Sequence, residues 1–169
     1  MQILVLNSTP MIYLAKVNAL ELLEKLPEKK VIPNSVYEEV VTKGKKRGAA
    51  DALLIEKAID RGILEVREVK NKKLFKTLAQ IPGLHRTDAE VLALSKELNA
   101  TAIVDEDKAR GVADVNDVPN RGTGYLLLRF SKLGLLTKEE VKTKVDEMIK
   151  FGWRCSTEVY AEILKSVMS

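Results

Sequence analysis

A distinctive group of acidic residues lies between residues 84 and 110 of this 169-residue chain. Asp88 stands at the start of a predicted helix, and a strand predicted at Thr101–Val104 ends on three consecutive acids, Asp105 to Asp107. In an open parallel sheet, ligands bind at the edge where the strands reach their carboxyl ends. We therefore expect these acids, rather than acids scattered along helix faces, to carry the chemistry of the protein.

Two further polar residues are predicted to reach the same edge of the sheet. Asn7 directly follows the first predicted strand, and Glu39 lies in the second predicted helix. If the first and fourth strands are neighbours, these side chains meet Asp88, Asp105 and Asp107 at one place. Several oxygen ligands with no histidine or cysteine among them suit Mg²⁺ or Mn²⁺.

Such a cluster predicts metal-assisted hydrolysis of a phosphodiester. Acidic clusters of this kind bind the ion weakly, and the phosphates of the substrate complete its coordination. The ion polarises the phosphate, lowers the pKa of the attacking water and stabilises the leaving oxygen. No covalent intermediate is expected, because the activated water attacks phosphorus directly.

Each of these residues also has a simpler structural interpretation. Asp88 could complement the dipole of its helix, which is worth roughly 0.3–1 kcal/mol, and Glu39 could be a solvated residue on a helix surface. Glu90 has the spacing of a capping box with Thr87. Asn7 could be a turn former only. The joint placement of these residues indicates a site, whereas no single one does.

Short apolar runs alternate with amphipathic segments, which indicates strands that alternate with helices. The predicted strands are Ile3–Leu6, Lys30–Ile32, Ile63–Val69, Thr101–Val104 and Val118–Asn120. The predicted helices are Met11–Leu26, a segment beginning near Asn34, Ala49–Arg61, Thr87–Leu98, a turn or two at Lys108–Val112, Tyr125–Leu133, Thr137–Phe151 and Ser156–Val167. Three capping boxes are predicted, Ser35 with Glu38, Thr87 with Glu90, and Thr137 with Glu140. This alternation predicts an α/β fold with a parallel sheet of four or five strands between helical layers.

The composition, 46% hydrophobic and 31% charged residues, fits an ordinary globular domain. We expect a single domain over residues 1–169, with a core over 1–136 and a C-terminal helical extension over 137–169. The lone Cys155 and lone His85 exclude a disulfide framework and a multi-histidine zinc site within one chain. The net charge of +4 permits an anionic partner without requiring one. No apolar run is long enough for a transmembrane helix and no basic leader precedes the first strand, so a cytoplasmic location is expected.

Four segments of the sequence, in this order, resemble the PIN-domain family. They are LNSTPMIYLAKVNALELLEKL from Leu6, VIPNSVYEEV from Val31, TDAEVLALSKELNATAIVDEDKAR from Thr87 and GTGYLL from Gly122. The chain most resembles the archaeal and bacterial branch related to VapC toxins. The resemblance covers nearly the whole chain, and it implies a three-layer α/β/α fold with ribonuclease activity and a cluster of acids that holds Mg²⁺ or Mn²⁺.

The acids of the family fall on particular positions of this chain. The resemblance places them at Asn7, Glu39, Asp88 and the run from Asp105 to Asp107, where Asp107 is favoured as a ligand and Asp105 comes second. It thereby implies Glu39, Asp88 and Asp107 as catalytic residues. The implied metal ligands are Asn7, Glu39, Asp88, Asp105 and Asp107. The chain departs from the family pattern at Asn7, which offers a carbonyl oxygen but removes one negative charge.

The resemblance implies a divalent-metal-dependent endoribonuclease that is the toxin-like half of a toxin–antitoxin pair. RNA is then the expected substrate, with Ser8, Arg110 and Arg121 near its phosphates, and an antitoxin protein and a second copy of the chain are the expected partners. The basic segments Lys43–Arg47 and Lys70–Lys76 could hold an RNA backbone or be solvated loops.

Two alternatives stay open. The chain could be a catalytically weak or silent PIN fold that binds RNA or a protein, with the missing acid at Asn7 as the clue. It could also be a nucleotide-binding doubly wound domain, although no glycine-rich turn follows the first strand after Leu6.

Overall fold

A computed structural model describes residues 2–168 of the chain. In chain order its elements are β1 (Ile3–Leu6), α1 (Ser8–Lys16), η1 (Leu20–Lys25), β2 (Lys29–Pro33), α2 (Asn34–Tyr37), η2 (Glu38–Thr42), α3 (Lys43–Lys46), α4 (Ala50–Asp60), β3 (Glu65–Arg67), α5 (Lys72–Ala79), α6 (Arg86–Leu98), β4 (Thr101–Ile103), α7 (Asp107–Val115), β5 (Asn120–Arg121), α8 (Thr123–Lys132), α9 (Lys138–Lys150) and α10 (Thr157–Met168). The element η1 is a 3₁₀ helix, and η2 is a π-helical turn within the continuous helical segment formed by α2, η2 and α3.

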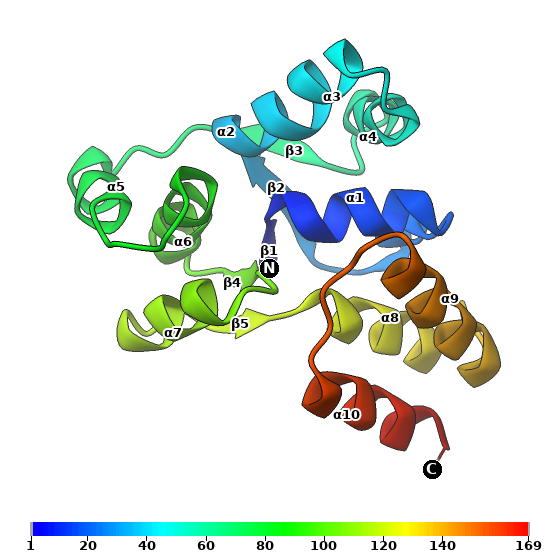
Figure 1. Cartoon of the computed structure of the whole chain (residues 1–169). Helices are drawn as coiled ribbons and strands as arrows, with labels where there is room; N and C mark the ends of the chain where they lie inside the picture. Colours follow the sequence, from blue (N-terminus) through cyan, green and yellow to red (C-terminus); the bar gives the residue numbers. More distant parts are fainter. Residues whose placement is uncertain (1, 169) are drawn as a thin grey trace.

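The five strands form one parallel sheet in the order β3-β2-β1-β4-β5 (Figure 1). The first and fourth strands are therefore neighbours, which is the arrangement that the predicted site requires. Leu6 of β1 pairs with Ile103 of β4, and the N–H of Asn7 donates to the carbonyl of Ile103 at 3.1 Å. The residues that follow β1 and β4 thus emerge side by side at the carboxyl edge of the sheet.

The two central strands are covered on both faces, as their unbroken apolar sequences predict. Val5, Leu6, Ala102 and Ile103 have no solvent exposure. Helix α6 packs against β1, β2 and β4 on one face, and α1 covers the opposite face (Figure 1). The predicted α/β fold, with helical layers on both sides of a parallel sheet, is confirmed.

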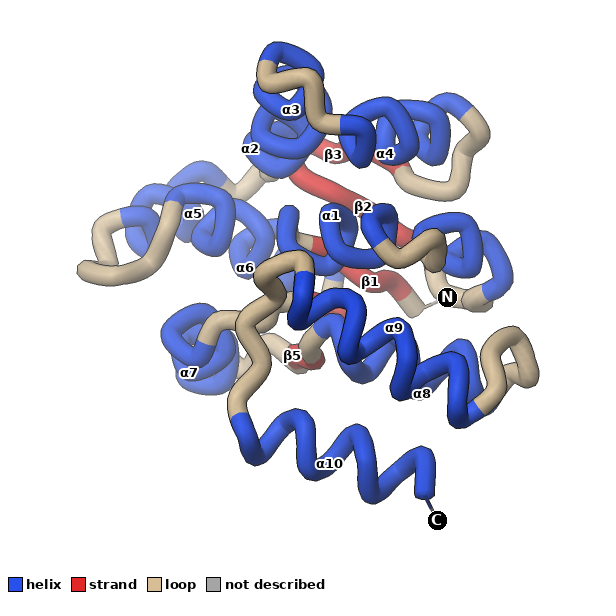
Figure 2. The backbone as a smooth tube through the Cα atoms, turned by 45° about the vertical axis from the view of Figure 1, so that its right-hand side comes forward, coloured by secondary structure: helices blue, strands red, loops and turns tan. Residues whose placement is uncertain are grey.

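The last three helices stack on one another beside the β5 edge of the sheet (Figure 2). Helix α10 contacts α8 and α9, and α9 begins with the predicted capping box between Thr137 and Glu140. The side chain of Ile163 in α10 packs on Gly124 of α8, where an added Cβ atom would lie 2.8 Å from Cδ1 of Ile163. Among residues 2–168, no helix combines the length and the apolar character needed to cross a membrane.

Three predicted elements differ from the structure. The single helix predicted over Met11–Leu26 is divided into α1 and η1, because Asn18 adopts a left-handed conformation with φ of 58° between them. The basic segment Lys70–Lys76, considered as a loop, instead enters α5, whose first turn is capped by the side chain of Asn71. The strand predicted over Ile63–Val69 shortens to β3.

Two predicted capping boxes are wrong. Helix α6 begins before Thr87, so that its N-cap is His85, and the carboxylate that reaches back to the N-cap N–H belongs to Asp88. Glu90 is buried and accepts a hydrogen bond from the N–H of Ser35 at 3.3 Å instead. This bond joins the start of α2 to α6, and Glu38, the predicted partner of Ser35, is exposed.

Candidate functional site

Asn7 and Asp88 are joined by a buried hydrogen bond at the carboxyl edge of the sheet. Nδ2 of Asn7 donates to Oδ1 of Asp88 at 2.6 Å. Asn7 is also the N-cap of α1, and its Oδ1 accepts from the N–H of Ser8 at 2.9 Å. These two bonds fix the amide so that its NH₂ group, and not its carbonyl, faces the acid. In this orientation the carbonyl oxygen of Asn7 accepts from the N–H of Ser8, and the expectation that this oxygen also binds a cation stays a prediction.

Asp88 is a buried carboxyl group whose side chain is held at both oxygens. It is only 4% exposed, and its Oδ2 accepts from the N–H of His85 at 3.1 Å. Burial raises the pKa of Asp88, and the hydrogen bonds from Asn7 and His85 oppose that rise. The negative charge of Glu106, which precedes α7, raises the pKa of Asp88 as well, as the smallest of these causes.

Glu39 is connected to this pair through Ser8. The hydroxyl group of Ser8 donates to Oε2 of Glu39 at 2.8 Å, and Ser8 directly follows Asn7 in the chain. Glu39 lies within the π-helical turn η2, a feature that occurs frequently at functional sites. Asn7, Ser8, Glu39 and Asp88 together form what we term the acidic network.

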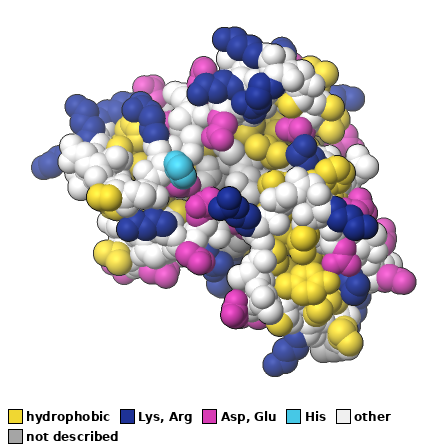
Figure 3. Space-filling view, in the orientation of Figure 1, with side chains coloured by type: hydrophobic (Ala, Val, Ile, Leu, Met, Phe, Trp, Pro, Cys, Tyr) yellow, Lys and Arg dark blue, Asp and Glu magenta, His cyan; other side chains and the backbone are white. Residues whose placement is uncertain are grey.

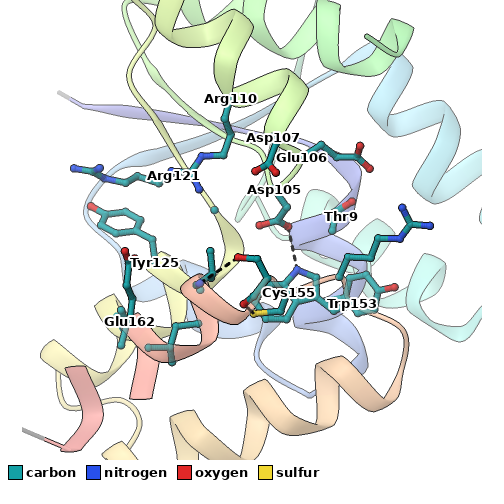
Figure 4. Close-up of a pocket in the computed structure, with 18 of the residues that line it drawn as sticks. Thr9, Asp105, Glu106, Asp107, Arg110, Arg121, Tyr125, Trp153, Cys155 and Glu162 are labelled. Atoms are coloured by element: carbon teal, nitrogen blue, oxygen red, sulfur yellow. Dashed lines mark hydrogen bonds between the residues drawn. The ribbon is translucent and has the colours of Figure 1, made fainter. Parts of the chain in front are cut away.

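Asp105 belongs to a separate cluster. Its Oδ1 accepts from the N–H of Thr123 at 2.7 Å, and its Oδ2 accepts from Oγ1 of Thr123 at 2.6 Å and from Nε1 of Trp153 at 3.3 Å. Gly122 allows this approach, because a Cβ atom there would lie 2.8 Å from Oδ1 of Asp105. We term Asp105, Thr123 and Trp153 the Asp105 anchor. It ties the end of β4 to the start of α8 and to the segment that leads into α10 (Figure 4).

Glu106 and Asp107 are exposed residues that follow the anchor. Figure 4 shows Glu106 directed toward Thr9 at the start of α1, whereas Asp105 is directed toward Trp153. The sequence interpretation missed Glu106. The signal that could have identified it is the alternation of side chains in an extended segment, which puts Asp105 and Glu106 on opposite sides of the backbone.

The expected metal cluster is not assembled as predicted. Within residues 2–168, no three histidine, cysteine, aspartate or glutamate side chains are grouped so that they could hold a metal ion. The reason is that Asp105 is turned toward Thr123 and Trp153, and Asp107 is exposed in the first turn of α7, whereas Asp88 and Glu39 belong to the acidic network.

The donors of the acidic network nevertheless fit a hard divalent cation. Mg²⁺ is usually bound by one or two carboxylates together with the phosphates of a substrate, rather than by a cage of protein ligands. Asp88 and Glu39 supply two carboxylates, and Glu106 adds a negative charge that acts on Asp88.

The three predicted substrate contacts are divided between these clusters. Ser8 lies in the acidic network, where its hydroxyl group donates a hydrogen bond to Glu39. Arg110 and Arg121 lie on the Asp105 side and line a pocket there (Figure 4). Nε of Arg110 donates to Asn120 at 3.1 Å, and neither arginine forms an ion pair with another described residue.

Basic side chains gather over α3 and over α5 on the face that carries the site, and acidic side chains lie between them and the C-terminal helices (Figure 3). The basic residues of the predicted segment at α3 are exposed, and one of them, Lys45, is paired with Glu56 at 3.0 Å.

A known protein family matches the chain over nearly its whole length. The family model DUF3368, described as a PIN domain, matches residues 3–169, which include the acidic network and the Asp105 anchor. No curated protein matches the chain significantly.

Proposed function

Because the chain belongs to the PIN-domain family, whose members are typically nucleases, we propose that it is a divalent-metal-dependent endoribonuclease. The observation that carries this proposal is the acidic network at the carboxyl edge of the sheet. There Asp88 is buried and held by Asn7, and Glu39 is held by Ser8. Ligands of open parallel sheets bind at this edge, so the network lies where a substrate phosphate would arrive.

The residues of the network have distinct roles in this proposal. Asp88 and Glu39 would hold Mg²⁺ or Mn²⁺, which would supply polarisation of the phosphate and a lower pKa for the attacking water. Asn7 and Ser8 orient these carboxylates, because each donates to one carboxylate oxygen, and the other oxygen of Asp88 accepts from the N–H of His85. Glu106 adds negative charge near Asp88, which favours a cation beside the buried acid.

The test is cleavage of a generic RNA by the native chain, by Asp88→Asn and by the control variant Asp60→Asn. Asp60 is exposed on α4 and outside the network, so its change to asparagine alters the net charge equally. We expect cleavage in Mn²⁺ that disappears in EDTA, a loss of about 100-fold or more in Asp88→Asn, and no change in Asp60→Asn.

Two outcomes contradict the proposal. If the native chain and both variants are equally inert across Mg²⁺, Mn²⁺ and a range of pH, the chain is not a ribonuclease. If all three cleave equally, the activity belongs to another site or to a contaminant.

The toxin-like role in a toxin–antitoxin pair is a further part of the proposal, and it rests on the resemblance to the VapC-related branch. Expression of the native chain in a bacterial host should then arrest growth, and expression of Asp88→Asn should not. A homodimer and an antitoxin partner are proposed on the same basis. Sedimentation equilibrium of the purified chain tests the dimer, and growth without arrest contradicts the toxin role.

One observation favours a second candidate function, a PIN fold that binds RNA without cleaving it. The NH₂ group of Asn7 faces Asp88 at 2.6 Å, so the buried acid is satisfied by a neutral donor without any cation. If the native chain does not cleave RNA in Mn²⁺ in the experiment above, but binds the same RNA in a separate binding assay, this second function is identified.

A further inference from the structure

A large pocket lies between the carboxyl edge of the sheet and the C-terminal helix α10 (Figure 4). Its volume is about 1120 Å³, and its walls come from α1, the β4–α7 segment, β5, α8, α10 and the segment before α10. Sites for single small molecules enclose roughly 300–1,000 Å³. The pocket therefore has room for more than one nucleotide. None of the four residues of the acidic network lines it.

Four cationic side chains line the pocket without forming a close ion pair to a described residue, and they share its walls with four acidic residues, Asp105, Glu106, Asp107 and Glu162. Arg110, Arg121, Arg154 and Lys108 all face it, and none of them forms an ion pair with any residue from 2 to 168. Arg121 and Arg154 are exposed. A guanidinium group presents paired donors that match the oxygens of a phosphate. Three such groups around one cavity favour a ligand that carries more than one phosphate.

The pocket also offers a surface on which a base can stack. The guanidinium carbon of Arg121 lies 5.4 Å from the ring centroid of Tyr125, and both side chains line the cavity. Unpaired bases stack on aromatic rings and on arginine planes, and each such contact contributes to binding with little dependence on sequence. The combination of guanidinium groups that form no ion pair with a tyrosine ring is therefore suited to an unpaired nucleotide.

The C-terminal helix restricts what can enter. Ile163 of α10 packs on the backbone of Gly124, and the hydroxyl group of Tyr160 donates to Asp146 of α9 at 2.7 Å. These contacts hold α10 along one side of the cavity. A base-paired helix keeps its bases inside the stack, whereas a single strand can turn them into a cavity that is closed on one side.

The pocket adjoins the acidic network through one residue. Thr9 lines the pocket beside Glu106 and directly follows Ser8 of the acidic network in the chain. A single strand of RNA bound in the pocket would therefore run past Glu106 toward the acidic network. We propose that this pocket binds nucleotides of single-stranded RNA, with phosphates at Arg121 and Arg154 and a base against Tyr125. The proposal rests on the proposed function in taking RNA as the ligand, and it adds a binding site that the acidic network does not include.

The experiment measures the binding of 5′-fluorescein-labelled octauridylate by fluorescence anisotropy in EDTA, where a metal-dependent nuclease does not cleave. The test variant is Arg121→Gln/Arg154→Gln, which removes two exposed guanidinium groups without breaking an ion pair. The matched control is Lys25→Gln/Lys132→Gln, which removes the same charge from exposed residues. Lys25 precedes β2 and Lys132 ends α8, so both lie toward the opposite edge of the sheet.

We expect the test variant to bind at least about tenfold more weakly, because each lost contact is a charge-assisted hydrogen bond. The slope of log affinity against log salt should fall by about 1.4, the value for two phosphate contacts on a single strand. The control should keep both the affinity and the slope. Trp153 is the only tryptophan of the chain and lines the pocket, so its emission should change when octauridylate binds to the native protein.

Three results overturn the proposal. Equal losses in the test and control variants would show that only net charge matters. Equal competition by an RNA duplex of the same length would show that the site is not selective for single strands. Equal competition by an octaglutamate peptide would identify the pocket as a site for acidic peptides.

The outcomes separate this proposal from the proposed function. Binding in EDTA that depends on Arg121 and Arg154, without cleavage in Mn²⁺, would retain the pocket and reject the nuclease. Cleavage that requires Asp88, with unchanged binding in the pocket variant, would retain the nuclease and reject the pocket.

Discussion

Replacing Asn7 by aspartate tests the central contact of the acidic network. Aspartate caps a helix as well as asparagine does, so the bond to the N–H of Ser8 is retained. The NH₂ group that donates to Oδ1 of Asp88 at 2.6 Å becomes a carboxylate oxygen. Two carboxylates in contact do not both ionise without a large cost. Asn7→Asp therefore puts the charge of the family pattern at this position and destabilises the metal-free protein.

The magnitude follows from the contact that is lost. A hydrogen bond to a charged acceptor contributes about 1.5–3 kcal/mol. Raising the pKa of the paired acids costs a further amount of about 1.4 kcal/mol at pH 7.5 for each unit by which that pKa in the folded protein exceeds its value in the unfolded chain. We expect a total loss of about 3 kcal/mol at pH 7.5 in EDTA, which lowers Tm by about 6–12 °C in a chain of this size. Mn²⁺ at 100 times its Kd should restore about 2.7 kcal/mol.

The assay is thermal unfolding followed by circular dichroism, in EDTA and in excess MnCl₂. The matched control is Asn71→Asp at the N-cap of α5, where the asparagine side chain also accepts from a backbone N–H but is exposed. The control should change Tm by no more than about 2–4 °C. An unchanged Tm for Asn7→Asp in EDTA would refute the contact with Asp88. A lowered Tm that MnCl₂ raises no more than in the native chain would refute the proposed cation site.

Three further predictions concern stability and are measured by urea unfolding. Thr123→Val should cost about 1.5–3 kcal/mol, because Oγ1 of this fully buried residue donates to Asp105 at 2.6 Å. Gly122→Ala should cost a similar amount, because its Cβ atom would displace the carboxylate of Asp105. In the double variant the two losses should not add, since both changes remove the same contact. Additive losses would show that the Asp105 anchor is not a single unit. Arg129→Met should cost about 2–3 kcal/mol at pH 7, less than a fully buried pair because the arginine side chain is 21% exposed. Since the hydrogen bond from Arg129 lowers the pKa of Glu28 below 4.5, the native chain should lose this contribution as the pH falls from 4.5 through the lowered value. If Arg129→Met loses as much stability on acidification as the native chain does, this role of the Arg129–Glu28 pair is contradicted.

The features that the sequence predicts well are those that depend on local pattern. The unbroken apolar runs before Asn7 and Asp105 indicate buried parallel strands, and both are found as neighbours in the sheet. The contact between Asn7 and Asp88 spans 81 positions, yet it is predictable in outline, because both residues adjoin the carboxyl edge of one sheet.

The features that the sequence does not predict depend on small shifts or on distant packing. Helix α6 begins before Thr87, and this shift makes Asp88 a capping residue as well as a buried acid. The partner of Asp105 in the C-terminal segment, Trp153, is 48 positions away and belongs to no local pattern. The two adjacent acids Asp105 and Glu106 also differ, because Asp105 accepts hydrogen bonds from Thr123 and Trp153 whereas Glu106 is exposed.

The π-helical turn η2 makes the position of Glu39 depend on the number of residues as well as on their identity. A π-helical turn carries one residue more than the α-helical turn it replaces. Deleting one residue there would rotate the two halves of the helix against each other by about 100°. The helix would then keep either Val36 before the turn or Gly44 after it in its present packing, but not both, and Glu39 would hold its place beside Ser8 in only one of these cases. A relative of this protein can therefore gain or lose this carboxylate through a one-residue insertion or deletion, with every surrounding residue unchanged.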